Sequence, residues 1–211
     1  MEIRDTMDRF NLLADIIAGR RSIRKFNGEP VDEALLKRIL SLATHAPSNN
    51  NRQGWRFYLV SNRDVIATMY RQVEKALQDA EKREGLVQEV LSSYKTNFLH
   101  FKAAPVVMAC CFIKPSRFPF KVFQTSDENR HLTGELLSLA MCIQNLLLLV
   151  ETAGLGAVVM TAPLIAAQAL KDTLDIPAKY SIGALVSMGY FDVKPPAPPH
   201  KPLQDVLRII D

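Results

Sequence analysis

Two periodicities run through the apolar residues of the chain, one helical and one extended. Helical spacing predicts helices around residues 10–17 and from residues 32, 62, 132 and 163 onwards. Asp32 is a suitable N-cap for the second helix, and either Asn62 or Asp64 for the third. Apolar alternation and short apolar runs predict strands at 55–60, 104–113, 157–160 and 182–188. Long helices dominate, so the pattern favours a single α/β or α+β domain over residues 1–211.

The helix predicted over residues 132–152 is apolar on nearly every side. Such a helix is buried, so we expect it at the centre of the domain or in a subunit interface. Gln144 and Asn145 interrupt the apolar run and leave it too short for a membrane span. Prolines crowd residues 195–202 and predict an extended tail, and the apolar residues 203–210 are expected to dock against another surface.

Composition is typical of a soluble globular protein. Apolar residues make up 48% of the 211 residues, and 26 basic against 22 acidic residues give a formal charge of +4. Outside residues 20–25 the basic residues are scattered, and aromatic residues do not alternate with them, which argues against a nucleic-acid partner. The first ten residues include acidic side chains and lack the apolar run of a secretory signal. We therefore expect a cytoplasmic protein.

One short segment concentrates positive charge, because Arg20, Arg21 and Arg24 lie within five residues together with Ser22. A phosphate monoester carries about −1.5 to −2 charges at pH 7, and its oxygens accept paired hydrogen bonds from arginine. The serine hydroxyl and the loop amides would complete such a cradle. From charge spacing alone, a solvated basic turn is the commoner explanation of the same residues.

A second polar segment, residues 47–55, precedes the first predicted strand and includes several amide side chains. Amides both donate and accept hydrogen bonds, so they suit the mixed edge of a heteroaromatic ring. The same composition is typical of an ordinary turn. This segment therefore gains meaning only in combination with others.

The sequence holds no local motif for hydrolytic or metal-dependent catalysis. Gly154-Leu155-Gly156 lacks the third glycine of a dinucleotide fingerprint, and no P-loop pattern occurs. The four histidines are dispersed, and no Cys/His spacing predicts a metal site. Cys110, Cys111 and Cys142 lie in apolar runs and are expected to be buried free thiols. We assign no side chain as a catalytic acid, base or nucleophile.

Four segments, taken in order, resemble the nitroreductase family of FMN-dependent oxidoreductases. RRSIRKF at 20–26 resembles the family's RRSxRxF, and APSNNNRQGWRFYLV at 46–60 resembles APSxxNxQPW. QNLLLLVETAGLGAVVM at 144–160 resembles QNLLLAAxxxGLGS. GALVSMGY at 183–190, with the proline-rich tail and its HKPL, resembles the family's last strand and C-terminal arm. The resemblance spans nearly the whole chain, and four ordered motifs are more specific than any one of them.

The resemblance implies that the cofactor FMN is held by residues from five parts of the sequence. By position these are Arg20, Arg21, Ser22 and Arg24; Pro47, Ser48, Asn49, Asn51 and Gln53; Asn97; Met160, Thr161 and Ala162; and His200 with Lys201. It assigns residues 20–22 mainly to the phosphate and Arg24 to the pyrimidine side of the ring, where a cation would stabilise developing negative charge. Residues 47–49 would reach the flavin bound mainly by the partner subunit.

The remaining assignments concern the ring and the ribityl chain. Asn51 and Gln53 would approach either of them, Asn97 would bind the ribityl chain, and residues 160–162 would present a backbone amide to flavin N5. Two positions depart from the family pattern. Gly54 replaces the usual proline, which is expected to loosen that loop. His200, followed by Lys201, replaces a phosphate-binding arginine and is expected to weaken that end, since histidine is less dependably charged at neutral pH.

The implied fold is α+β with three layers, a central mainly antiparallel sheet flanked by helices. The implied assembly is a homodimer in which the C-terminal arm, about residues 191–211, is domain-swapped onto the partner. The implied activity is FMN-dependent oxidoreduction by a ping-pong mechanism. A hydride passes from NADH or NADPH through flavin N5 to a small organic acceptor of nitroaromatic or quinone type.

Two kinds of alternative remain open. Flavin fragmentation, reductive dehalogenation and enoate reduction are other reactions on the same scaffold, and a flavin-binding protein without turnover is a different class. Residues 114–130, which include Phe118, Phe120 and Phe123, follow no clear period and contain prolines, which indicates a loop or lid. They are candidates for the pocket cover that selects the acceptor, and equally for ordinary core filling.

Overall fold

A computed structural model describes residues 3–82, 96–114 and 130–210. Four strands form one sheet in the order β1-β2-β4-β3, and each neighbouring pair is antiparallel. The strands are β1 Trp55–Val60, β2 Val106–Ile113, β3 Gly156–Met160 and β4 Tyr180–Gly189. The helices of eleven or more residues are α1 Ile3–Gly19, α2 Glu33–Ala43, α3 Arg63–Glu81 and α6 Arg130–Thr152, and α7 Ala167–Thr173 is shorter.

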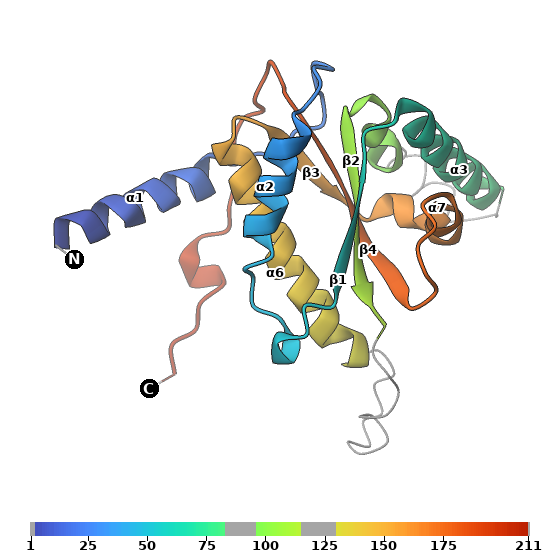
Figure 1. Cartoon of the computed structure of the whole chain (residues 1–211). Coiled ribbons are helices and arrows are strands. Elements are labelled where there is room, and N and C mark those ends of the chain that lie inside the picture. The colour runs from blue at the N-terminus through green and yellow to red at the C-terminus, as the bar shows by residue number, and fades with distance from the viewer. Residues whose placement is uncertain (1–2, 83–95, 115–129, 211) are drawn as a thin grey trace.

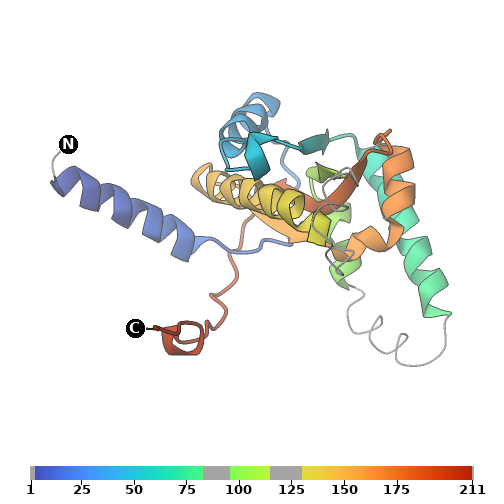
Figure 2. The same ribbon diagram turned by 90° about the horizontal axis from the view of Figure 1, so that it is seen from below.

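Helices cover both faces of the sheet, which gives three layers (Figures 1 and 2). Strand β2 shows why, because it is buried on both sides and its alternate residues enter two separate cores. Met108 and Cys110 pack with α2 and α6, whereas Val107, Ala109 and Cys111 pack with α3 and α7. The expected α+β fold with a mainly antiparallel sheet is therefore confirmed.

Local sequence signals explain where the helices begin and end. The Asp32 side chain accepts a hydrogen bond from the Ala34 amide and caps α2. Asn62, rather than Asp64, caps α3. Helix α6 ends in a Schellman motif: Gly154 has a φ of 71°, and the Leu155 amide donates to the Val150 carbonyl at 3.0 Å. This glycine turn directs the chain from α6 straight into β3.

The chain exposes much apolar surface on its two terminal segments. Helix α1 and the residues after β4 extend away from the sheet, on the side that carries α6 (Figure 1). On α1, Phe10 is 64% exposed, and at the far end of the tail Ile210 is 84% exposed. The expected docking of residues 203–210 does not occur within this chain, since all of them are exposed. A large unburied apolar surface of this kind usually marks an interaction site.

Helix α6 lies across one face of the sheet and supplies much of that core. Its buried side chains include Leu139, Cys142, Leu146 and Val150. The window Gly134–Thr152 is also long and apolar enough to cross a membrane, a test that core helices of folded proteins pass as well. Of that window 44% is buried inside the protein.

Candidate functional site

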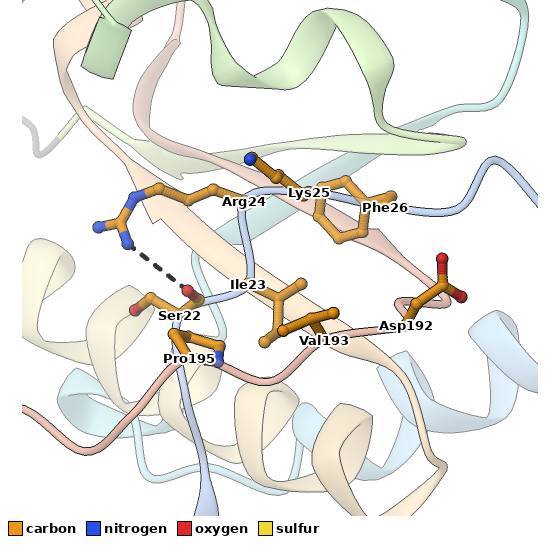
Figure 3. Close-up of a pocket in the computed structure, with 8 residues that line it drawn as sticks. All are labelled: Ser22, Ile23, Arg24, Lys25, Phe26, Asp192, Val193 and Pro195. Carbon is orange, nitrogen blue, oxygen red and sulfur yellow. Dashed lines mark hydrogen bonds between the residues drawn. The ribbon is translucent and has the colours of Figure 1, made fainter.

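A single isoleucine fixes the basic segment that the sequence singles out. Ile23 is 1% exposed, and its amide donates a 3.0 Å hydrogen bond to the Ala157 carbonyl of β3. Gly156 makes room for it, because a Cβ there would lie 2.5 Å from Ile23 Cγ1. Since side chains alternate along an extended segment, burial of Ile23 turns Ser22 and Arg24 the other way (Figure 3).

The phosphate-binding residues expected from the sequence gather around one cavity of about 430 Å³. Its lining includes Arg20, Arg21, Ser22, Arg24 and His200. Within the described part of the chain, no carboxylate pairs with any of the three arginines. Such a cavity, with concentrated and unpaired positive charge, favours an anionic ligand.

Arg21 has a divided role at this cavity. Its Nη1 atom donates to the carbonyls of Ala18 and Arg20 at 2.6 and 2.8 Å, which ties the guanidinium to the C-terminal end of α1. Its Nε atom is buried and has no hydrogen-bond partner. A buried donor left unpaired is costly, and because this atom has almost no accessible surface, it does not face the cavity.

A second cavity of about 290 Å³ brings together the residues expected at the ring. Arg24 lines both cavities, and here it is joined by Asn97, His100 and residues 158–162 at the end of β3. The sequence motifs therefore converge in space, although Asn97 and Met160 are far apart in the chain. Lys201 lines neither cavity, and it is exposed.

His100 is a site residue that the sequence analysis missed. It lies in the short helical turn His100–Ala103 and lines the second cavity beside Arg24. Burial lowers the pKa of its imidazole, and the positive charge of Arg24 lowers that pKa further. A neutral imidazole donates from one nitrogen and accepts at the other. Only its spacing of three residues from Asn97, one helical turn, could have indicated it.

The second polar segment does not reach these cavities in its own chain. Residues 47–53 are absent from both linings and lie instead against the early turns of α6. Asn49, Asn51 and Gln53 are exposed. The Ser48 hydroxyl accepts a 3.1 Å hydrogen bond from the backbone N–H of Gln53. Glu135 packs directly against Gly54, and the expectation that this glycine loosens the loop stays a prediction.

The buried thiols offer no nucleophile. Burial raises the pKa of Cys111 to about 12 and that of Cys142 to about 11, and it raises the pKa of Cys110 well above its usual range. Among the described residues, no three His, Cys, Asp or Glu side chains group as a metal site. Phe118, Phe120 and Phe123 lie outside the described residues.

The nitroreductase family model matches residues 17–190 of the chain. YfhC of Bacillus subtilis (strain 168), whose name assigns it to the NAD(P)H nitroreductases, is 26% identical over 195 residues, 92% of each chain. A BluB-like flavoprotein from Clostridium difficile 630 superimposes with a TM-score of 0.82 at 24% identity, over 94% of this chain and 99% of that one. Iodotyrosine deiodinase, solved with FMN and 3-iodo-L-tyrosine, gives a TM-score of 0.69 at 25% identity over 90% and 95%. The chain therefore belongs to the nitroreductase family.

Proposed function

We propose that the chain is an FMN-dependent NAD(P)H oxidoreductase. The observation that carries the proposal is that Arg24 lines two cavities, one with unpaired arginines and the other with Asn97 and residues 160–162. An anionic phosphate suits the first end, and a hydrogen-bonding heteroaromatic ring suits the second. The donor set thus fits FMN.

The residues of this chain bind and orient the cofactor. Arg20, Arg21 and Ser22 hold the phosphate, and His200 replaces an arginine there with a weaker, pH-dependent donor. Arg24 lies at the pyrimidine side of the ring and stabilises negative charge on it. Bound FMN supplies two-electron chemistry, taking a hydride from NADH or NADPH and giving it to a small organic acceptor in a ping-pong sequence.

The proposed active unit is a homodimer in the cytoplasm. The exposed apolar residues of α1 and of the tail at 203–210 provide a surface that a second copy would bury. Leu136 and Leu137 on α6 are also exposed. In such a dimer the loop at 47–53 would supply amide groups to the cofactor of the partner, while the C-terminal arm would wrap the second subunit.

The acceptor is proposed to be a nitroaromatic or quinone. Flavin fragmentation and dehalogenation stay as alternatives, since a BluB-like flavoprotein and a deiodinase share the fold. Among the described residues no feature favours either alternative. The segment expected to choose the acceptor, residues 114–130, lies almost wholly outside the described part of the chain.

The experiment that tests the proposal is a visible spectrum of the purified protein, followed by anaerobic addition of NADH or NADPH. The expected result is a bound flavin spectrum, or uptake of added FMN, and bleaching by at least one nicotinamide. A nitroaromatic or quinone added next should restore the oxidised spectrum. A protein that neither contains nor takes up FMN would refute the proposal. Bound FMN that no nicotinamide reduces would instead favour a non-catalytic flavin-binding protein.

A further inference from the structure

A buried carboxylate fastens the loop at 48–53 to α6. The Glu135 side chain is 2% exposed, and its Oε1 atom lies 3.0 Å from Nη1 of Arg52, whose side chain is 43% exposed. The contact is ionic and lies outside hydrogen-bond geometry, so Oε1 has no hydrogen-bond donor. A charge this deeply buried requires its partner, because removal of one ion leaves the other uncompensated.

Two glycines let the loop and the helix approach closely enough for this pair. At Gly54 a Cβ would lie 2.6 Å from Oε2 of Glu135 and 2.7 Å from Cγ2 of Ile113. At Gly134 a Cβ would lie 3.0 Å from Nδ2 of Asn49. The loop therefore has a glycine where α6 projects Glu135, and α6 has a glycine where the loop projects Asn49.

A hydrogen-bond relay adds a second fastening. The backbone N–H of Asn49 donates to Ser138 Oγ at 3.0 Å, and that hydroxyl donates to the Gly134 carbonyl at 2.6 Å. At and beside these anchors three residues have positive φ: Asn50 at 50°, Asn51 at 53° and Gln53 at 48°. Such angles are uncommon for residues other than glycine, and asparagine tolerates them better than most, so Gln53 is the residue whose backbone most requires support from its surroundings.

Stability alone does not account for this arrangement. Desolvation of a buried ion pair commonly cancels its attraction, and an apolar replacement is often equally stable. The arrangement uses a buried charge and unusual backbone angles to fix a loop in which the exposed side chains of Asn51 and Gln53 hydrogen-bond to each other. Fixing of this kind is useful when those side chains must meet a ligand with defined geometry.

We propose that Glu135 is a positioning residue, which, through Arg52 and Gly54, presets the loop at 48–53 for contact with FMN in the second subunit. The inference rests on the proposed function, since it needs FMN at a dimer interface. It extends that function by assigning a role to three residues, none of which touches the cofactor. The role of Gly54 in this proposal is to leave space for the Glu135 carboxylate, which a side chain at this position would occupy.

The test compares Glu135→Gln, Arg52→Gln, Arg52→Lys and the double variant Glu135→Gln with Arg52→Gln. FMN affinity is measured by titration of apoprotein, and the bound flavin by its visible circular dichroism and midpoint potential. Arg52→Gln should weaken FMN binding by about tenfold and alter the dichroism, and Arg52→Lys should restore both. The double variant should be less impaired than Arg52→Gln, because it leaves no unpaired buried charge.

Glu33→Gln is the matched control, because Glu33 and Lys37 form an exposed pair at 2.6 Å on α2. It should leave FMN affinity and the spectrum unchanged. Wild-type affinity, dichroism and potential in both Glu135→Gln and Arg52→Gln would overturn the positioning role while the proposed function stands. Absence of FMN binding by the wild-type dimer would instead remove the proposed function itself. If Glu135→Gln proves insoluble, the comparison of Arg52→Gln with Arg52→Lys decides, since it changes only the exposed partner.

Discussion

The two polar segments of this protein are built in opposite ways. The basic segment at 20–24 lies against β3 and lines cavities within its own chain, whereas the loop at 48–53 lies against α6, with the exposed side chains of Asn51 and Gln53 hydrogen-bonded to each other. One buried apolar residue, Ile23, places the first segment, and a buried ion pair and strained backbone place the second. Under the proposed function, the chain contains one half of its site and holds the other half ready for a second copy.

The largest expected effect comes from separating the two halves. Phe10→Glu with Ile210→Glu puts charge on apolar surface that is 64% and 84% exposed in the single chain. Each side chain buried in a dimer contributes about 1.5–3 kcal/mol, and symmetry counts each twice, so the dimer should weaken by about 10⁴-fold or more. Sedimentation should show monomers, with residual FMN binding through the basic segment alone. Ile165→Glu, on the other side of the sheet, is the control; a dimeric double variant would contradict the division of the site.

Loss of the basic half is the next largest effect. Arg20→Ala with Arg24→Ala removes two charge-assisted contacts of about 1.5–3 kcal/mol each, so FMN affinity should fall at least about 100-fold. The dimer should persist, which fluorescence titration and sedimentation together would establish. Lys37→Ala with Arg38→Ala removes the same charge from α2 and should change neither. Unaltered FMN occupancy in the Arg20 and Arg24 variant would show that the assignment of this segment is wrong.

A smaller effect is expected from the support beneath the basic segment. Gly156→Ala would bring a Cβ to 2.5 Å from Ile23 and displace the segment from β3. Overpacking of this size typically costs about 1–3 kcal/mol in the free energy of unfolding, which urea denaturation would measure. Adding Ile23→Ala removes the two clashing γ-carbons, so the double variant should lose less stability than the sum of the two single substitutions. No change in either stability or FMN affinity would argue that the segment is held elsewhere.

The smallest effect concerns pH. Because the pKa of His100 is lowered in the folded state by burial and by Arg24, the unfolded chain binds a proton more readily. The contribution of His100 to stability is therefore complete above about pH 6.5 and falls as the pH drops through that value toward the folded pKa. Urea unfolding at several pH values should show a shallower loss in His100→Gln than in the wild type. An NMR titration of Arg24→Ala should show a higher His100 pKa.

Much of the fold follows from periodicity, and less of the site does. Alternation and short apolar runs located all four strands, with boundaries that differ by about two residues, since burial is a local property of a strand. The basic segment was visible because its charges are adjacent in sequence. The sequence marked Gly54 only as a departure from the family motif and did not mark Glu135, because their contact joins residues far apart in the chain and depends on the packing of α6. His100 was overlooked for the same reason, since only the fold brings it beside Arg24 in the second cavity.

Cys110 and Cys111 are adjacent on β2, and their thiols can report when the helices that cover each face of the sheet move away from it. Their side chains enter different cores, Cys110 beneath α2 and α6 and Cys111 beneath α3 and α7. A thiol-alkylating reagent cannot reach either one until the layer above it lifts, so the labelling rate measures that local event. In variants that keep a single cysteine, the two rates would therefore show which side of the sheet uncovers first.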